Sequence, residues 1–205
     1  MTVTSARTTS TTLRRRAQWL VRATIAWNAI EAVVAVSAGV AAGSAALLGF
    51  GLDSAVEVSA AIVALWYLRG ADDSRGLMAG RLMGLSFWAL AAWVTVDAVG
   101  ALAAWTEPEH SAAGITMTAL SLVVMPGLAM AKRRTGQALG SKALVSESNQ
   151  TAVCAYLSAA VLIGLLLSGI GWHWADPVAA LVVAAIAARE GAEAWRGELG
   201  EGGCC

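Results

Sequence analysis

Six long apolar stretches take up most of this chain of 205 residues. About 20 apolar residues are the length that an α-helix needs to cross the ~30 Å hydrocarbon core of a bilayer. The stretches cover residues 17–40, 45–68, 82–105, 112–131, 150–170 and 175–195. Short connectors join them, and nothing of domain size is left outside the bilayer. The sequence therefore predicts an all-α membrane protein with six transmembrane helices.

The composition excludes several other classes of protein. Apolar residues make up 58% of the chain and charged residues only 14%, and the mean hydropathy is +0.65. A soluble domain normally has about 25% charged residues, because its surface must be solvated. A soluble enzyme, a disordered chain and a nucleic-acid binder are therefore excluded.

The two ends of the chain are expected to be short cytosolic tails. Residues 1–16 are rich in Ser and Thr and predict a disordered tail, residues 17–196 form the transmembrane domain, and residues 197–205 form a second tail. That second tail ends in Cys204 and Cys205, which are either a soft-metal acceptor or a free thiol pair or lipidation site. Three cysteines with a cytosolic pair imply no disulfide framework.

The basic residues predict the orientation in the membrane. All 14 lysines and arginines lie in the N-terminal region, in the connectors 69–81 and 132–149, or at the C-terminal end. The positive-inside rule then places both termini in the cytoplasm, in a multi-pass protein of the plasma (inner) membrane. No Lys or Arg is expected inside the membrane. Asp176 and Pro177 predict the start of the last helix, as a side-chain cap followed by proline.

Acidic residues inside the spans are candidates for function. A charged group at the membrane centre costs at least ~2.5 kcal/mol, so it is normally paired, protonated or functional. Asp53 and Glu57 are four residues apart and share one helix face. A bound cation, or protons alternating with it, relieves the repulsion between them. The alternative is that one carboxyl group stays protonated and bonds to a neighbouring helix.

Two further acids lie in other spans. Glu31 is an auxiliary ligand or proton site, or a protonated acid bonded to Asn28. Asp97 lies closer to the outer face, where it lines an exit path or makes a structural hydrogen bond.

The chain matches itself at an offset of 97 residues. Residues 43–57 align with residues 140–154, with six of fifteen positions identical, and the match pairs Asp53 with Gln150 and Glu57 with Cys154. The two segments enter the membrane from opposite faces, which is the pattern of inverted repeats with a substrate site near the midplane.

The depth of these residues supports a shared site. Asp53 and Gln150 each lie ten residues past their Gly-Ser pair, or ~15 Å into the membrane. Together with Glu57 and Cys154 they suit a divalent ion of borderline softness such as zinc, with cadmium, cobalt or iron as rivals. Glu147 lies one turn before Gln150, toward the cytoplasm, and is expected to receive the ion.

Two motifs carry a family resemblance: Gly43-Ser44 with Leu47-Leu48 and Asp53-Ser-Ala-Val-Glu57, and Gly171-Trp-His-Trp-Ala-Asp-Pro177. They resemble the cation diffusion facilitator family, whose members export zinc and other divalent cations in exchange for protons. The resemblance covers nearly the whole chain and implies a cation-efflux-type bundle. In that family Asp-x-x-x-Asp on the second helix and His-x-x-x-Asp on the fifth bind one metal ion.

The resemblance assigns the first pair of acids to Asp53 and Glu57. Gln150 stands where the family has His, and Cys154 where it has Asp. Gln is a poor zinc ligand, and the absent His is a proton carrier in the family. Cys154 is either a thiolate ligand for softer ions or a small buried apolar residue.

The family's usual cytoplasmic C-terminal domain is not expected in this chain. A homodimer would therefore use membrane faces. Gly39-x-x-x-Gly43 and Gly76-x-x-x-Gly80-x-x-x-Gly84 permit close helix approach, for which packing inside one subunit is the favoured explanation.

These observations lead to one main hypothesis. The chain is expected to be a secondary transporter that exports a divalent transition metal, with zinc first, by proton antiport. Its partners are then the metal cation, protons and the lipid bilayer, without nucleic acid, enzymatic activity or a cofactor. The alternative is a non-transporting membrane module on the same fold that senses metal or binds a partner.

Overall fold

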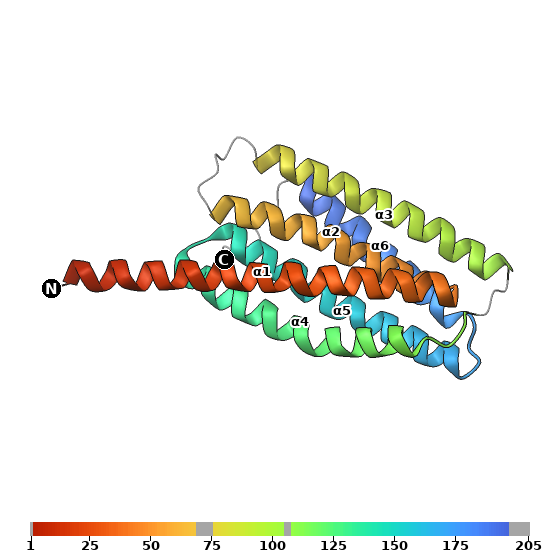
Figure 1. Ribbon diagram of the computed structural model, residues 1–205. Coiled ribbons are helices and arrows are strands. Elements are labelled where there is room, and N and C mark those ends of the chain that lie inside the picture. Colours follow the sequence, from red (N-terminus) through yellow and green to blue (C-terminus); the bar gives the residue numbers. More distant parts are fainter. Residues whose placement is uncertain (1, 69–75, 105–107, 197–205) are drawn as a thin grey trace.

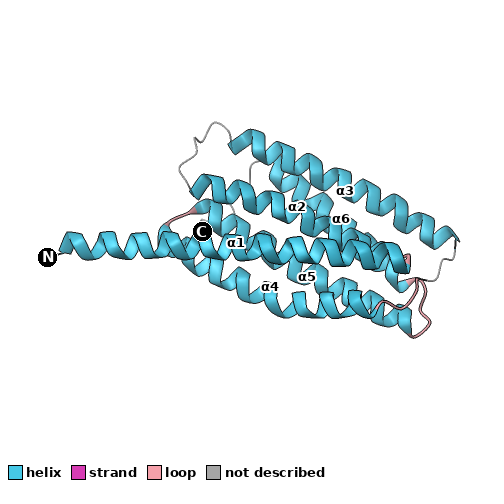
Figure 2. Cartoon of the chain, in the orientation of Figure 1, coloured by secondary structure: helices cyan, strands magenta, loops and turns pink. Residues whose placement is uncertain are grey.

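The computed structural model describes residues 2–68, 76–104 and 108–196. Within these residues the chain forms six α-helices and no strand (Figure 2). The helices are α1 (Thr2–Ala42), α2 (Ala45–Leu68), α3 (Gly76–Ala104), α4 (Ala112–Leu139), α5 (Lys142–Gly169) and α6 (Ala175–Arg196). The predicted all-α fold with six helices is confirmed.

The helices form one elongated bundle in which consecutive helices run in opposite directions (Figure 1). The most extensive contacts are those of α1 with α2, α3 with α6, and α4 with α5. Helix α2 is central, because it also contacts α3, α5 and α6. Side chains on α2 can therefore meet side chains from three other parts of the chain.

Five of the described helices, α1 to α5, are long and apolar enough to cross a membrane. Helix α6 has 22 residues, of which five are charged. Two of them, Asp176 and Glu190, are buried in the bundle. Charged groups that face protein and not lipid are what a helix at membrane depth requires.

The helices extend beyond the apolar stretches at two places. Residues 2–16, expected as a disordered tail, continue α1, and no Pro or Gly interrupts the chain before residue 39. The connector expected over residues 132–149 is only Gly140 and Ser141. The end of an apolar run therefore does not mark the end of the helix, because the helical backbone continues through the polar residues beyond it. The expected tail 197–205, with Cys204 and Cys205, lies outside the described residues.

The two segments of the internal repeat form the same corner. Gly43 and Gly140 end their helices with φ of 63° and 65°, a left-handed conformation that Gly adopts without strain. The Ser44 hydroxyl then accepts a hydrogen bond from the Leu47 amide at 3.1 Å, and the Ser141 hydroxyl accepts one from the Leu144 amide at 3.4 Å. The corners lie at opposite ends of the bundle (Figure 1), as the inverted repeat requires.

Small residues bring the paired helices together. A Cβ on Gly39 would lie 2.9 Å from the Leu48 amide nitrogen, and one on Gly136 would lie 3.1 Å from the Val145 amide nitrogen. Gly39 and Gly136 occupy equivalent positions of the repeat. A Cβ on Gly84 would lie 2.8 Å from the carbonyl oxygen of Gly191 on α6. Gly39 and Gly84, one from each glycine motif, therefore pack inside the subunit.

Asp176 has a different role from the expected one. Helix α6 begins at Ala175, and the buried Asp176 carboxylate accepts hydrogen bonds from the Ser44 hydroxyl at 2.5 Å and the Ala46 amide at 3.4 Å. It therefore caps the first turn of α2. The predicted cap motif marked the right helix start, but the carboxylate serves a helix 130 residues away in the sequence.

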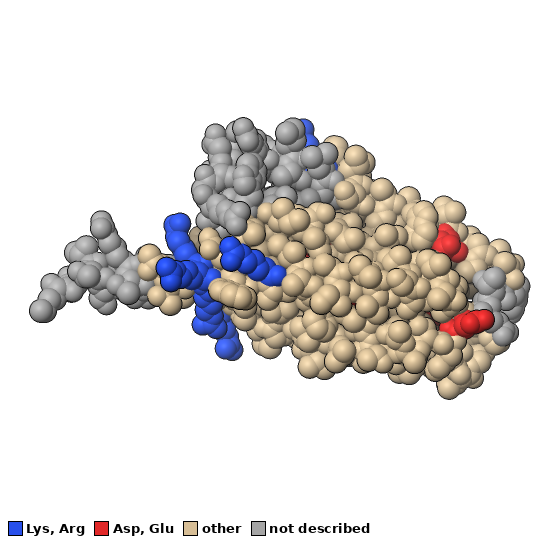
Figure 3. All heavy atoms as spheres, viewed as in Figure 1, with Lys and Arg blue, Asp and Glu red and all other residues tan. Residues whose placement is uncertain are grey.

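Charged side chains on the surface lie at the two ends of the bundle. In Figure 3 basic side chains gather where α1 joins the bundle, and acidic side chains lie near the opposite end. Arg14, Arg15 and Arg16 on α1 and Arg133 and Arg134 on α4 are all exposed. The apolar middle of the bundle separates the two groups.

The close packing at Gly39 and Gly136 predicts how the protein responds to a methyl group added at either position. Gly39→Ala and Gly136→Ala force the helices apart, and each should lower the free energy of unfolding by about 1–3 kcal/mol. Gly100→Ala is the control, because a Cβ there meets nothing within 4 Å. Thermal unfolding in detergent micelles measures the effect. Equal losses in all three variants would contradict the proposed close packing.

Candidate functional site

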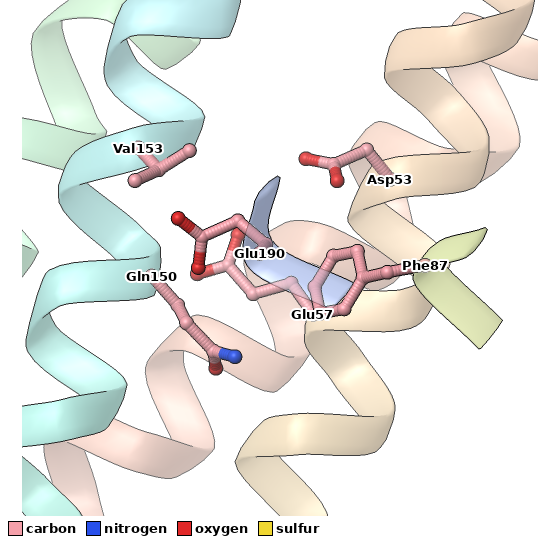
Figure 4. Close-up of a pocket in the computed structure, with 6 residues that line it drawn as sticks. All are labelled: Asp53, Glu57, Phe87, Gln150, Val153 and Glu190. Carbon is pink, nitrogen blue, oxygen red and sulfur yellow. The ribbon is translucent and has the colours of Figure 1, made fainter. Parts of the chain in front are cut away.

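A buried pocket lies between α2, α3, α5 and α6 (Figure 4). Its lining residues are Asp53, Glu57, Phe87, Gln150, Val153 and Glu190. The structure thus brings together three residues that the sequence analysis selected, namely Asp53, Glu57 and Gln150. No Lys, Arg or His is among the residues that line this pocket.

Helix geometry and the internal repeat explain why Asp53, Glu57 and Gln150 line the same pocket. Asp53 and Glu57 are one turn apart on α2, and both direct their side chains toward α5 (Figure 4). Gln150 comes from α5, which contacts α2. Because the corners at Gly43 and Gly140 lie at opposite ends, ten residues of helix bring Asp53 and Gln150 to similar depths. The three side chains are at most 8% exposed.

One oxygen of Glu57 is held by a hydrogen bond and the other is free. The Thr151 hydroxyl donates to Glu57 Oε1 at 2.7 Å. Thr151 in turn accepts a hydrogen bond from Lys132 Nζ at 2.5 Å. Glu57 Oε2 is buried and has no hydrogen-bond partner. The carboxylate is therefore fixed in orientation with one unused acceptor, and a buried acceptor of this kind is costly unless a ligand or proton satisfies it.

Lys132, expected in a connector, is instead buried inside the helix bundle. Its side chain is fully buried on α4, and its ammonium group lies 2.6 Å from Glu147 Oε1. The sequence analysis assigned Lys132 to a connector because the apolar stretch ends at residue 131. In the structure the helix continues, and packing of α4 on α5 buries the next turn. Glu147, expected to receive the ion, is the carboxylate that balances this charge.

Cys154 does not line the pocket. Its Sγ lies 3.9 Å from Glu31 Oε1 on α1, and the residue packs within the apolar core. The Ser121 hydroxyl donates to the other oxygen of Glu31 at 3.0 Å. Asn28, the suggested partner of Glu31, has no hydrogen-bond partner for its amide group. Glu31, Ser121 and Cys154 thus link α1, α4 and α5.

Two other placements complete the comparison with the predicted site. Asp97 is partly exposed on α3 and is absent from the pocket lining. In the part of the chain that the structure describes, no three His, Cys, Asp or Glu side chains are grouped closely enough to hold a metal ion. The pocket is therefore not a preformed cage of such ligands, and an ion would have to draw its carboxylates together.

Glu190 is a pocket residue that the sequence analysis missed. It lies on α6 and is 8% exposed. The sequence analysis did not single it out, although it falls within the apolar stretch 175–195. The buried residues Val183, Ala187, Glu190 and Ala194 follow the spacing of one helix face. That periodicity is the signal that places Glu190 inside the bundle.

Comparisons with known proteins agree with this architecture. The model of the cation efflux transmembrane domain matches residues 77–196. The chain is 26% identical to Transmembrane protein 163 of Xenopus laevis over 154 residues, which cover 73% of this chain and 55% of that protein. It is 30% identical to the cation-efflux pump FieF of Shewanella oneidensis over 76 residues, covering 37% of this chain and 26% of the pump. The matched segments span about half of the first relative and a quarter of the second.

The ion pair of Lys132 and Glu147 predicts that a variant lacking one partner is less stable than a variant lacking both. Lys132→Met leaves Glu147 as an unpaired buried charge and should lower the free energy of unfolding by about 3–5 kcal/mol. Lys132→Met combined with Glu147→Met removes both charges and should recover most of that loss. Thermal unfolding in the same detergent compares the two. A double variant as unstable as the single one would contradict the assignment of the pair.

Proposed function

Because the chain belongs to the cation efflux family, whose members are transporters and not enzymes, we propose that it exports a divalent transition-metal cation from the cytoplasm. The observation that carries this proposal is the pocket in which Asp53 and Glu57 face α5 with no base among the lining residues. The Lys132 charge is balanced by Glu147. The pocket carboxylates must therefore be neutralised by a bound cation or by protons.

Exchange between these two forms is the proposed mechanism. On the cytoplasmic side, Asp53 and Glu57 bind the metal ion, and Glu57 offers its free Oε2. Gln150 contributes from the opposite helix. On the outer side, protonation of the carboxyl groups weakens their hold on the ion and releases it. Proton antiport then follows from the competition of two kinds of cation for the same oxygens.

Zinc is the first ion to test, because the resemblance to zinc-exporting proteins suggests it. Zinc accepts carboxylate oxygen together with nitrogen and sulfur ligands. The proposed location is the plasma (inner) membrane. The basic residues at one end of the bundle favour an orientation with both termini in the cytoplasm.

Transport by the purified protein in proteoliposomes tests the proposal. The wild-type protein should move zinc or a related divalent ion, and a pH gradient of the correct sign should accelerate it. Asp53→Asn and Glu57→Gln should each reduce transport to the level of empty liposomes, because each removes a pocket charge. Glu193→Gln is the matched control, since Glu193 pairs with the exposed Arg189 and lies outside the pocket.

The same assay separates the rival explanations. Unchanged transport in the Asp53 and Glu57 variants would overturn the site. Metal binding without flux would favour a module that senses metal or binds a partner. Flux that ignores the pH gradient would exclude proton antiport while leaving metal transport in place.

The proposed orientation has its own test. In a background in which Cys154, Cys204 and Cys205 are replaced by Ser, a single cysteine is introduced at exposed Arg134 or at exposed Trp172. A membrane-impermeant maleimide added to intact cells should label the Trp172→Cys protein and spare the Arg134→Cys protein. The reverse pattern would show that the termini face outward.

A further inference from the structure

We infer that Glu190 of α6 is a further ligand of the transported ion, and that its carboxylate makes the site an all-oxygen one suited to a hard divalent cation such as Mn²⁺. This inference rests on the proposed function, whose transport site it shares. It keeps the export of a divalent metal and changes the preferred ion from zinc to a harder one.

The position of Glu190 is the first support. It lines the same pocket as Asp53, Glu57 and Gln150 and is 8% exposed. In Figure 4 its carboxyl group lies beside that of Glu57 and faces α5. Three carboxyl groups from two helices therefore share one pocket, and a divalent ion brings two positive charges to it.

Unpartnered atoms in the pocket are the second support. Glu57 Oε2 is buried without a hydrogen-bond partner, and so is Gln150 Nε2. Since nothing holds the Gln150 amide nitrogen, rotation of the amide costs no hydrogen bond at that atom and brings the carbonyl oxygen to its place. The pocket then offers oxygen atoms from Asp53, Glu57, Gln150 and Glu190.

The absence of sulfur and imidazole from the lining decides the class of ion. Cys154, whose sulfur lies 3.9 Å from Glu31 Oε1, is not among the residues that line this pocket. Carboxylate, carbonyl and water oxygens suit Mg²⁺, Ca²⁺ and Mn²⁺, whereas thiolate and imidazole select zinc and softer ions. Among transition metals, Mn²⁺ is the one that matches such a set of ligands.

The neighbouring basic residues do not neutralise the carboxylates of the pocket. Lys132 is the nearest base in the hydrogen-bond network, and it reaches Glu57 only through Thr151. Its own charge is matched by Glu147 at 2.6 Å. Arg189, next to Glu190 in sequence, is exposed and bonds to Glu193 at 2.9 Å. Neither base replaces a cation in the pocket.

The experiment measures Mn²⁺ and Zn²⁺ with the full-length protein. Binding of Mn²⁺ in nanodiscs is followed by electron paramagnetic resonance, because free Mn²⁺ gives a signal that weakens on binding. Flux of both ions is measured in proteoliposomes. Glu190→Gln keeps the shape of the side chain and removes its charge. Glu193→Gln, on the same helix and outside the pocket, is the matched control.

The expected result is that the wild-type protein binds Mn²⁺ and transports it at least as fast as Zn²⁺. Glu190→Gln should weaken Mn²⁺ binding by about tenfold or more, the scale seen even for partners of metal ligands, and Glu193→Gln should not. Gln150→His should shift flux toward Zn²⁺, since it adds an imidazole.

The outcomes separate this inference from the proposed function. If the ions are transported but Glu190→Gln behaves like Glu193→Gln, the inference is overturned and the transporter stands. If Mn²⁺ binds and depends on Glu190 but no ion is transported, the all-oxygen metal site stands and the export function fails. If Mn²⁺ neither binds nor moves while Zn²⁺ does, the all-oxygen site is overturned.

Discussion

The hydrogen-bonded chain from Lys132 through Thr151 to Glu57 is the interaction on which the pocket depends. A polar group that is buried in a packed bundle must find its partner in the protein. Lys132 meets this requirement with Glu147 and Thr151. Thr151 in turn donates a hydrogen bond to Glu57 and so fixes one oxygen of its carboxylate. The other oxygen of Glu57 is left without a partner, as is Glu147 Oε2, and Glu57 Oε2 lies where an ion is proposed to bind.

The inverted repeat explains why this pocket lies deep in the bundle. Two Gly-Ser corners with the same hydrogen bonds start α2 and α5 from opposite ends. Each helix then needs the same number of residues to bring a polar side chain to the pocket. Glycines at equivalent positions before the corners, Gly39 and Gly136, let each pair of helices pack closely. The same Gly-Ser corner, present once in each half of the repeat, thus sets the depth of the site.

Much of this fold could be predicted from the sequence, because membrane helices are defined by apolar length and by glycine corners. Asp53, Glu57 and Gln150 could be placed in one site because helix rise and the repeat fix their depths. Which residues face them from other helices depends on rotation of each helix, and hydropathy contains little information on rotation. Glu190 was missed for that reason, whereas Lys132 was missed because its helix continues past the apolar stretch. The same uncertainty left two roles open for Cys154, whose sulfur turns to Glu31.

The bond between Asp176 and Ser44 has a mechanical consequence for the pocket. It attaches the first turn of α6 to the first turn of α2 at one end of the bundle. Glu190 lies 14 residues further along α6, about 21 Å from this attachment. A movement that opens the pocket must either keep the joined ends of α2 and α6 together or break a buried carboxylate away from its cap. The simpler motion is a hinge in which α2 and α6, attached at this end, move against α5.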